Sequence, residues 1–231
     1  MFNSLKFKVI LFGFIFTFFS SFGQSYFLGL FNSSIREALS ITHGQFGSIY
    51  ASATLCSSLL LIWVGKKIDD VNIFKFAFFV TILLSFACFF FSRVTSVFLL
   101  FIAIFLMRFS GQGMMSHTAS TTISRYFTKT RGRALSISWF GLSSAEFIMP
   151  VLMVYLLTII DWQNLWLIFS ISVLIILPIV SFLLIKNLNL DSREANDENI
   201  KHVEIKQWRR RDVLKDYRFY IISLNMLAMP W

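Results

Sequence analysis

Residues 165–185 read LWLIFSISVLIILPIVSFLLI, a run of 21 residues without one charged side chain. A helix needs about 20 mainly apolar residues to cross the hydrocarbon core of a bilayer, so this run predicts a membrane span. Comparable runs occupy residues 9–31, 45–64, 73–91, 97–124 and 134–158, and a shorter one occupies residues 217–231. The sequence therefore predicts an all-α membrane protein with six spanning helices and the start of a truncated seventh.

The composition argues against a soluble domain. Hydrophobic residues make up 56% of the 231 residues and charged residues only 14%, whereas soluble domains are roughly 25% charged. An aromatic share of 18% argues against disorder. Both cysteines, Cys56 and Cys88, lie in apolar runs, which favours a packing role over a disulfide or a metal site. We expect no metal and no cofactor.

The basic residues predict the orientation of the chain. Of the 21 Lys and Arg, Arg36 and Arg93 fall outside the cell and Arg108 within a span if the N-terminus is cytoplasmic, which leaves 18 inside. This asymmetry predicts a multi-pass protein of the cell membrane with a cytoplasmic N-terminus. It also accounts for the net charge of +9 without nucleic acid as a partner, because the basic loops lie beside anionic lipid headgroups.

The first apolar run has an alternative interpretation. Lys6 and Lys8 precede it and the small residues Ser21 and Gly23 lie near its middle, as in a cleavable secretory signal. The run continues to residue 31, however, and a signal core has only roughly 7 to 15 residues. A spanning helix is therefore the favoured interpretation.

The segment between the sixth and seventh runs differs in composition. Residues 187–216 mix acidic side chains with the basic cluster 209–211, which predicts a polar linker on the cytoplasmic face. We therefore expect a six-helix bundle over residues 1–186, the linker over residues 187–216, and the start of the seventh helix over residues 217–231.

Three short motifs lie in or near the loops of this arrangement. They are Gly65-Lys66-Lys67-Ile68-Asp69-Asp70 after the second span, Arg108-Phe109-Ser110-Gly111-Gln112-Gly113 in the fourth, and Arg131-Gly132-Arg133-Ala134 at the start of the fifth. Together with six spans and a polar linker, they resemble the major facilitator superfamily, whose G-x-x-x-D signature the first motif matches. The chain departs from the family pattern at Asp70, where a basic residue is usual, and at residues 72–74, which lack the second glycine and its basic neighbours.

This resemblance implies the amino-terminal half of a twelve-helix secondary transporter. Such a half consists of two inverted three-helix repeats, and it moves a small solute by alternating access at an interface with a second, here missing, six-helix bundle. The echo between residues 22–25, FGQS, and residues 110–113, SGQG, fits corresponding first and fourth helices. The resemblance implies a conformational role for Gly65, Asp69, Arg131, Gly132 and Arg133.

Arg108 is the strongest single candidate for a functional residue. A basic residue in the middle of a span costs about 2.5 to 3.5 kcal/mol on insertion scales, so it must face protein or a wet cavity. Glu146 is the only acidic residue deep in a span. Two interpretations stay open. Arg108 attracts an organic or inorganic anion while Glu146 titrates as a proton site, or the two residues form a fixed structural ion pair.

Other polar residues in the spans are candidates for the pathway of the solute or proton. Gln112 follows Arg108 by one helical turn, Tyr50 and Thr54 are one turn apart in the second span, and Gln24 lies in the first. Small and hydroxylated residues equally serve close helix contacts in membranes, so both roles stay open. His117 lies on the opposite face of the helix from Arg108. It is interpreted as a packing histidine or a proton relay.

An enzyme is the weakest interpretation of this sequence. The three histidines, His43, His117 and His202, fall in a loop, a span and the linker, and neither H-E-x-x-H nor G-x-S-x-G occurs. The rival to a transporter is a membrane scaffold or sensor that moves no solute, or an inactive fragment.

Overall fold

The computed structural model describes residues 4–186 and 210–228. The chain divides into two units, Met1–Glu194 and Ala195–Trp231. In the second unit, two short helices are described, α10 (Arg210–Lys215) and α11 (Tyr217–Ala228). Residues 187–209 of the predicted linker lie outside the described residues.

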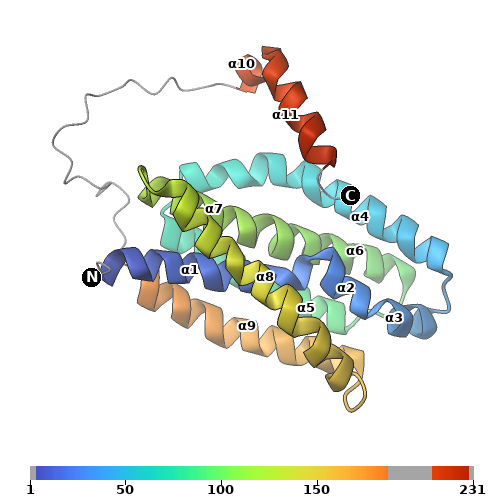
Figure 1. Ribbon diagram of the computed structural model, residues 1–231. Coiled ribbons are helices and arrows are strands. Elements are labelled where there is room, and N and C mark those ends of the chain that lie inside the picture. Colours follow the sequence, from blue (N-terminus) through green and yellow to red (C-terminus); the bar gives the residue numbers. More distant parts are fainter. Residues whose placement is uncertain (1–3, 187–209, 229–231) are drawn as a thin grey trace, which may run out of the picture. The chain divides into compact units, whose positions relative to one another are not determined.

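Six helical segments in the first unit are long and apolar enough to cross a membrane (Figure 1). They are Leu5–Gly23, His43–Asp69, Ile73–Ser92, Val97–Tyr126, Arg131–Leu156 and Trp162–Ile185. Each overlaps one of the predicted spans, and the prediction of an all-α membrane bundle is confirmed.

The first span is interrupted rather than continuous. Helix α1 (Ser4–Ser20) gives way to a single 3-10 turn, η1 (Ser21–Gly23), and Gln24 is extended before α2 (Ser25–Leu30) and α3 (Asn32–Leu39) follow. The predicted span over residues 9–31 is therefore wrong in its second half, where the helix stops and restarts. The reason is a close backbone contact with the fourth span at Gly23.

The fourth span is also irregular where it meets the break in the first span. Helix α6 (Val97–Met107) passes into a π-helical segment, η3 (Arg108–Met115), before α7 (Ser116–Tyr126). A Cβ placed on Gly23 would lie 2.9 Å from the Cα of Gly111, and one on Gly111 would lie 2.8 Å from the Cα of Gly23. The two glycines thus let the backbones touch. They belong to the two tetrapeptides that echo each other in the sequence.

Two pairs of spans pack closely along each other, and the second span packs against the fourth. The helices are α4 (His43–Val64) with the 3-10 turn η2 (Gly65–Asp69), α5 (Ile73–Ser92), α8 (Arg131–Leu156) and α9 (Trp162–Ile185). Helix α5 lies along α9 and α1 lies along α8 (Figure 1).

Hydroxyl groups join the helices of each pair. Ser85 on α5 and Ser170 on α9 donate to each other's carbonyl oxygens at 2.9 and 2.8 Å, and Thr17 on α1 donates to the Ser138 carbonyl on α8 at 2.6 Å. Such bonds stabilise helix contacts where the hydrophobic effect is weak, because lipid is as apolar as the core.

An aromatic cluster fills the core beside the break in the first span. Trp166 of α9 is fully buried, with ring centroids 4.6 Å from Phe91, 5.1 Å from Phe31 and 5.6 Å from Phe27. Phe27 and Phe31 follow the break, so the cluster holds the outer part of the first span against α5 and α9.

Candidate functional site

Arg108 is the first residue of the π-helical segment and points into the bundle. Its side chain is only 8% exposed. Nη1 donates to the Gly23 carbonyl at 3.0 Å and to Ser25 Oγ at 3.3 Å, and the guanidinium lies over the ring of Tyr50 at 5.3 Å from its centroid. The break between η1 and α2 therefore supplies the acceptors, and α4 supplies the aromatic face.

The contacts of Arg108 are all with neutral groups. Among the residues that the structure describes, no carboxylate forms an ion pair with it. Its Nε is buried without a hydrogen-bond partner, and so is the hydroxyl of Thr54, one turn along α4 from Tyr50. A buried guanidinium with neutral partners keeps its full positive charge inside the bundle, and it retains one donor for a further acceptor.

Glu146 occupies a different environment. It is exposed on α8. No ion pair between Arg108 and Glu146 is found in the described part of the chain. The interpretation as a fixed ion pair is thus not supported by this structure. Glu146 is exposed whereas Arg108 is buried, and the role of Glu146 as a proton site stays a prediction.

The other pathway candidates lie at the break or beside it. Tyr50 contacts Arg108, Gln112 is half-buried one turn further along η3, and Gln24 is the half-buried extended residue at the break. Sequence reasoning missed Gly23 and Ser25 as acceptors for Arg108. The echo between residues 22–25 and 110–113 was the signal that pointed to them.

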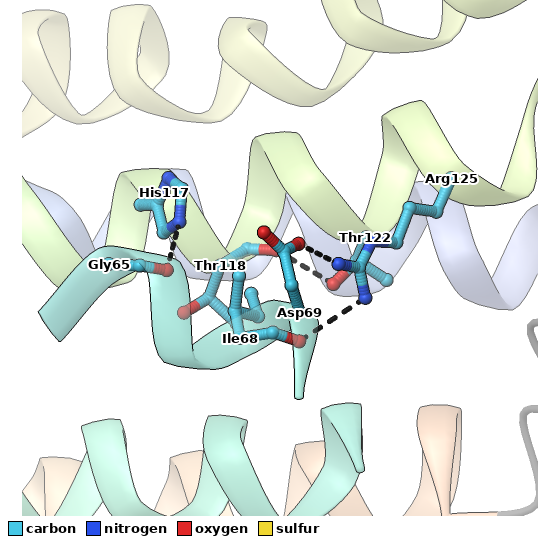
Figure 2. A network of polar contacts seen from close by, with 7 residues as sticks. All are labelled: Gly65, Ile68, Asp69, His117, Thr118, Thr122 and Arg125. Atoms are coloured by element: carbon cyan, nitrogen blue, oxygen red, sulfur yellow. Dashed lines mark hydrogen bonds and ion pairs between the residues drawn. The ribbon is translucent and has the colours of Figure 1, made fainter. Parts of the chain in front are cut away.

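A second polar cluster joins η2 to α7 (Figure 2). His117 Nε2 donates to the Gly65 carbonyl at 2.9 Å, since a carbonyl can only accept, and Arg125 Nη1 donates to the Ile68 carbonyl at 3.2 Å. Arg125 also forms an ion pair with Asp69. His117 is therefore engaged in packing η2 against α7, which matches one of its two interpretations.

This cluster gives Asp69 a partner, Arg125, within its own bundle. The conformational role that the resemblance implies for Asp69 stays a prediction. Arg125 was not singled out in the sequence because it sits at the end of a span, 56 residues away along the chain. The pair is partly exposed, with 31% and 56% of the two side chains accessible.

The third motif begins α8. Arg131 and Arg133 are exposed, and Arg131 Nε donates to the Phe127 carbonyl at 3.4 Å. A Cβ on Gly132 would meet nothing within 4 Å, so packing within this bundle does not require a glycine there. The structure does not connect this motif to Arg108.

The chain is thus a multi-pass helical membrane protein with one buried cation at the crossing of its first and fourth spans. No group of three or more His, Cys, Asp or Glu side chains that could hold a metal ion occurs among the described residues. The family model of the Major Facilitator Superfamily matches residues 13–230, and the chain belongs to this superfamily of membrane transporters. The comparisons with curated proteins and with solved structures found no match.

Proposed function

We propose that this chain is the amino-terminal half of a secondary transporter that moves a small anionic solute by alternating access, with Arg108 recognising the anion. The observation that supports this proposal is the buried guanidinium of Arg108, whose partners Gly23, Ser25 and Tyr50 are all neutral. An anion that reached Arg108 would neutralise a charge that the bundle itself leaves uncompensated.

The chemistry of the guanidinium fits such a role. Its planar array of donors binds carboxylate and phosphate groups through charge-assisted hydrogen bonds, which are shorter and stronger than neutral ones. One donor, Nε, is buried without a partner. Because a charge at this depth is costly without water, a partner or a ligand, an anionic solute would also lower the cost of keeping Arg108 in the membrane.

The most exposed spans indicate where a second six-helix bundle would pack. Only 11% of the apolar window of the second span and 28% of that of the fifth are buried. Glu146 lies on the fifth span and is exposed at membrane depth. A carboxylate there needs a wet cavity or a protein partner rather than lipid. We therefore propose that the second bundle covers this face and that Glu146 is a proton site in the cavity between the bundles.

The proposed location is the cell membrane, with the N-terminus in the cytoplasm. The support is the placement of 18 of 21 basic residues on that side, as counted above. Labelling of an introduced cysteine in the linker tests it. An impermeant reagent should leave residue 201 unlabelled in intact cells, and labelling from outside would overturn the orientation.

Uptake measurements on the full-length protein with its second bundle test the function. Arg108→Gln should strongly reduce the uptake of anionic solutes, and Arg108→Lys should weaken recognition because an ammonium lacks the planar fork. Arg93→Gln is the control, because this arginine lies over the Phe89 ring at the end of the third span, α5. Wild-type KM and rate in Arg108→Gln would remove the substrate role, and no flux in the wild type would favour the scaffold interpretation.

A further inference from the structure

A cavity of about 200 Å³ opens between α1 and α8, at the end of the bundle where both helices begin. Its polar lining consists of Lys6, Thr130 and Arg133, and its apolar lining includes Ile10, Ala134 and Ile137. The lining residues lie on α1, at the start of α8 and in the turn before it, whereas Arg108 begins η3 and Asp69 ends η2.

The lining is arranged in two levels. Lys6 and Ile10 are four residues apart on α1, and Arg133 and Ile137 are four residues apart on α8, so each pair shares a helix face. The apolar member of each pair lies about 6 Å further into the membrane than the basic member, at 1.5 Å per residue. On both helices, the cavity is therefore lined by a cation near the helix start and by an apolar side chain one turn further along.

Both helix starts add to the positive potential at the outer level. The first N–H groups of a helix carry a partial positive charge, and they favour a phosphate. Thr130 precedes the 26-residue helix α8, and its side chain makes no capping hydrogen bond. Thr130 therefore lines the cavity without capping the first turn of α8.

We propose that this cavity binds an anionic phospholipid, with the phosphate between Lys6 and Arg133 and the start of the acyl chains against Ile10 and Ile137. The two levels match the two parts of such a lipid, a charged headgroup and an apolar body. A small soluble anion would use only the outer level, and a zwitterionic lipid would gain less from two cations and two helix starts. The lipid would hold the first and fifth spans together where they enter the membrane.

Native mass spectrometry of the purified chain in detergent tests this proposal. The chain is titrated with phosphatidylglycerol and, separately, with phosphatidylcholine of the same acyl chains. We expect tighter binding of phosphatidylglycerol, and we expect the variant Lys6→Gln/Arg133→Gln to bind it about 30-fold more weakly, or roughly fivefold for each charge.

The matched control is Lys8→Gln/Arg131→Gln, which removes one charge from each of the same two helices at exposed positions that do not line the cavity. This variant should stay within about threefold of the wild type, because only the diffuse attraction of the surface is reduced. Equal losses in the two double variants would overturn the proposal, as would equal binding of the two lipids. Displacement of the lipid by inorganic phosphate would show a phosphate site and would also overturn it.

Discussion

The fourth span carries two arginines that differ in their burial and in the charge of their partners. Arg108 is buried at the middle of the span and contacts only neutral groups, whereas Arg125 is partly exposed at its end and pairs with the carboxylate of Asp69. A buried charge without a counterion costs free energy that a purely structural role would not repay. A partly exposed ion pair costs little and contributes little. This difference is the basis for the proposal that Arg108 recognises the solute, whereas Arg125 joins η2 to α7.

The largest expected effect contrasts these two arginines in transport. Arg108→Gln should reduce kcat/KM for uptake by about tenfold to a hundredfold, the effect of losing charge-assisted hydrogen bonds to an anion. Arg125→Gln should change it far less in the same assay. Similar losses in both variants would break the comparison, because recognition would then not be confined to Arg108.

The next effect concerns the backbone crossing that supplies an acceptor to Arg108. Gly23→Ala would push a Cβ against the Met107 carbonyl oxygen and the Gln112 amide, and overpacking of this kind costs about 1 to 3 kcal/mol. The control is Gly29→Ala, where a Cβ meets nothing within 4 Å. Its free energy of unfolding should not fall, because alanine favours a helix. Thermal unfolding in detergent measures both, and equal melting temperatures would contradict the close crossing.

A smaller effect is expected where η2 meets α7. His117→Phe keeps a ring of similar shape but loses the hydrogen bond to the Gly65 carbonyl. We expect the free energy of unfolding to fall by about 1 kcal/mol, the net value of one such bond. If uptake fell strongly while stability stayed unchanged, His117 would be a proton relay rather than a packing residue.

The smallest effect is expected at the ion pair itself. A double-mutant cycle with Asp69→Asn and Arg125→Gln should give a coupling energy of about 0.2 to 1 kcal/mol in unfolding, since both side chains are partly exposed. The coupling should shrink in high salt, which screens exposed charges. A coupling above about 2 kcal/mol would show that Arg125 is as strongly held as a buried charge, and the contrast with Arg108 would fail.

The amino-acid sequence by itself determined the positions of the six spans and the class of the protein, which is an all-α membrane protein. Runs such as residues 165–185 and 73–91 are spans because their own side chains are apolar, and the transfer of a helix into lipid depends on little else. Arg108 was also identifiable from the sequence, since a charged residue in the middle of a span is rare and costly and is therefore a candidate for function. These are local properties of the chain.

Only the tertiary structure decided what these residues contact. The break at Ser21–Gly23 arises because Gly23 meets Gly111 across the bundle. The partner of Asp69 is Arg125, and Glu146 is exposed whereas Arg108 is buried. Each of these outcomes depends on how helices far apart in sequence rotate and cross. Hydropathy and helical periodicity constrain the direction of each helix face, but not which face of a neighbouring helix it meets.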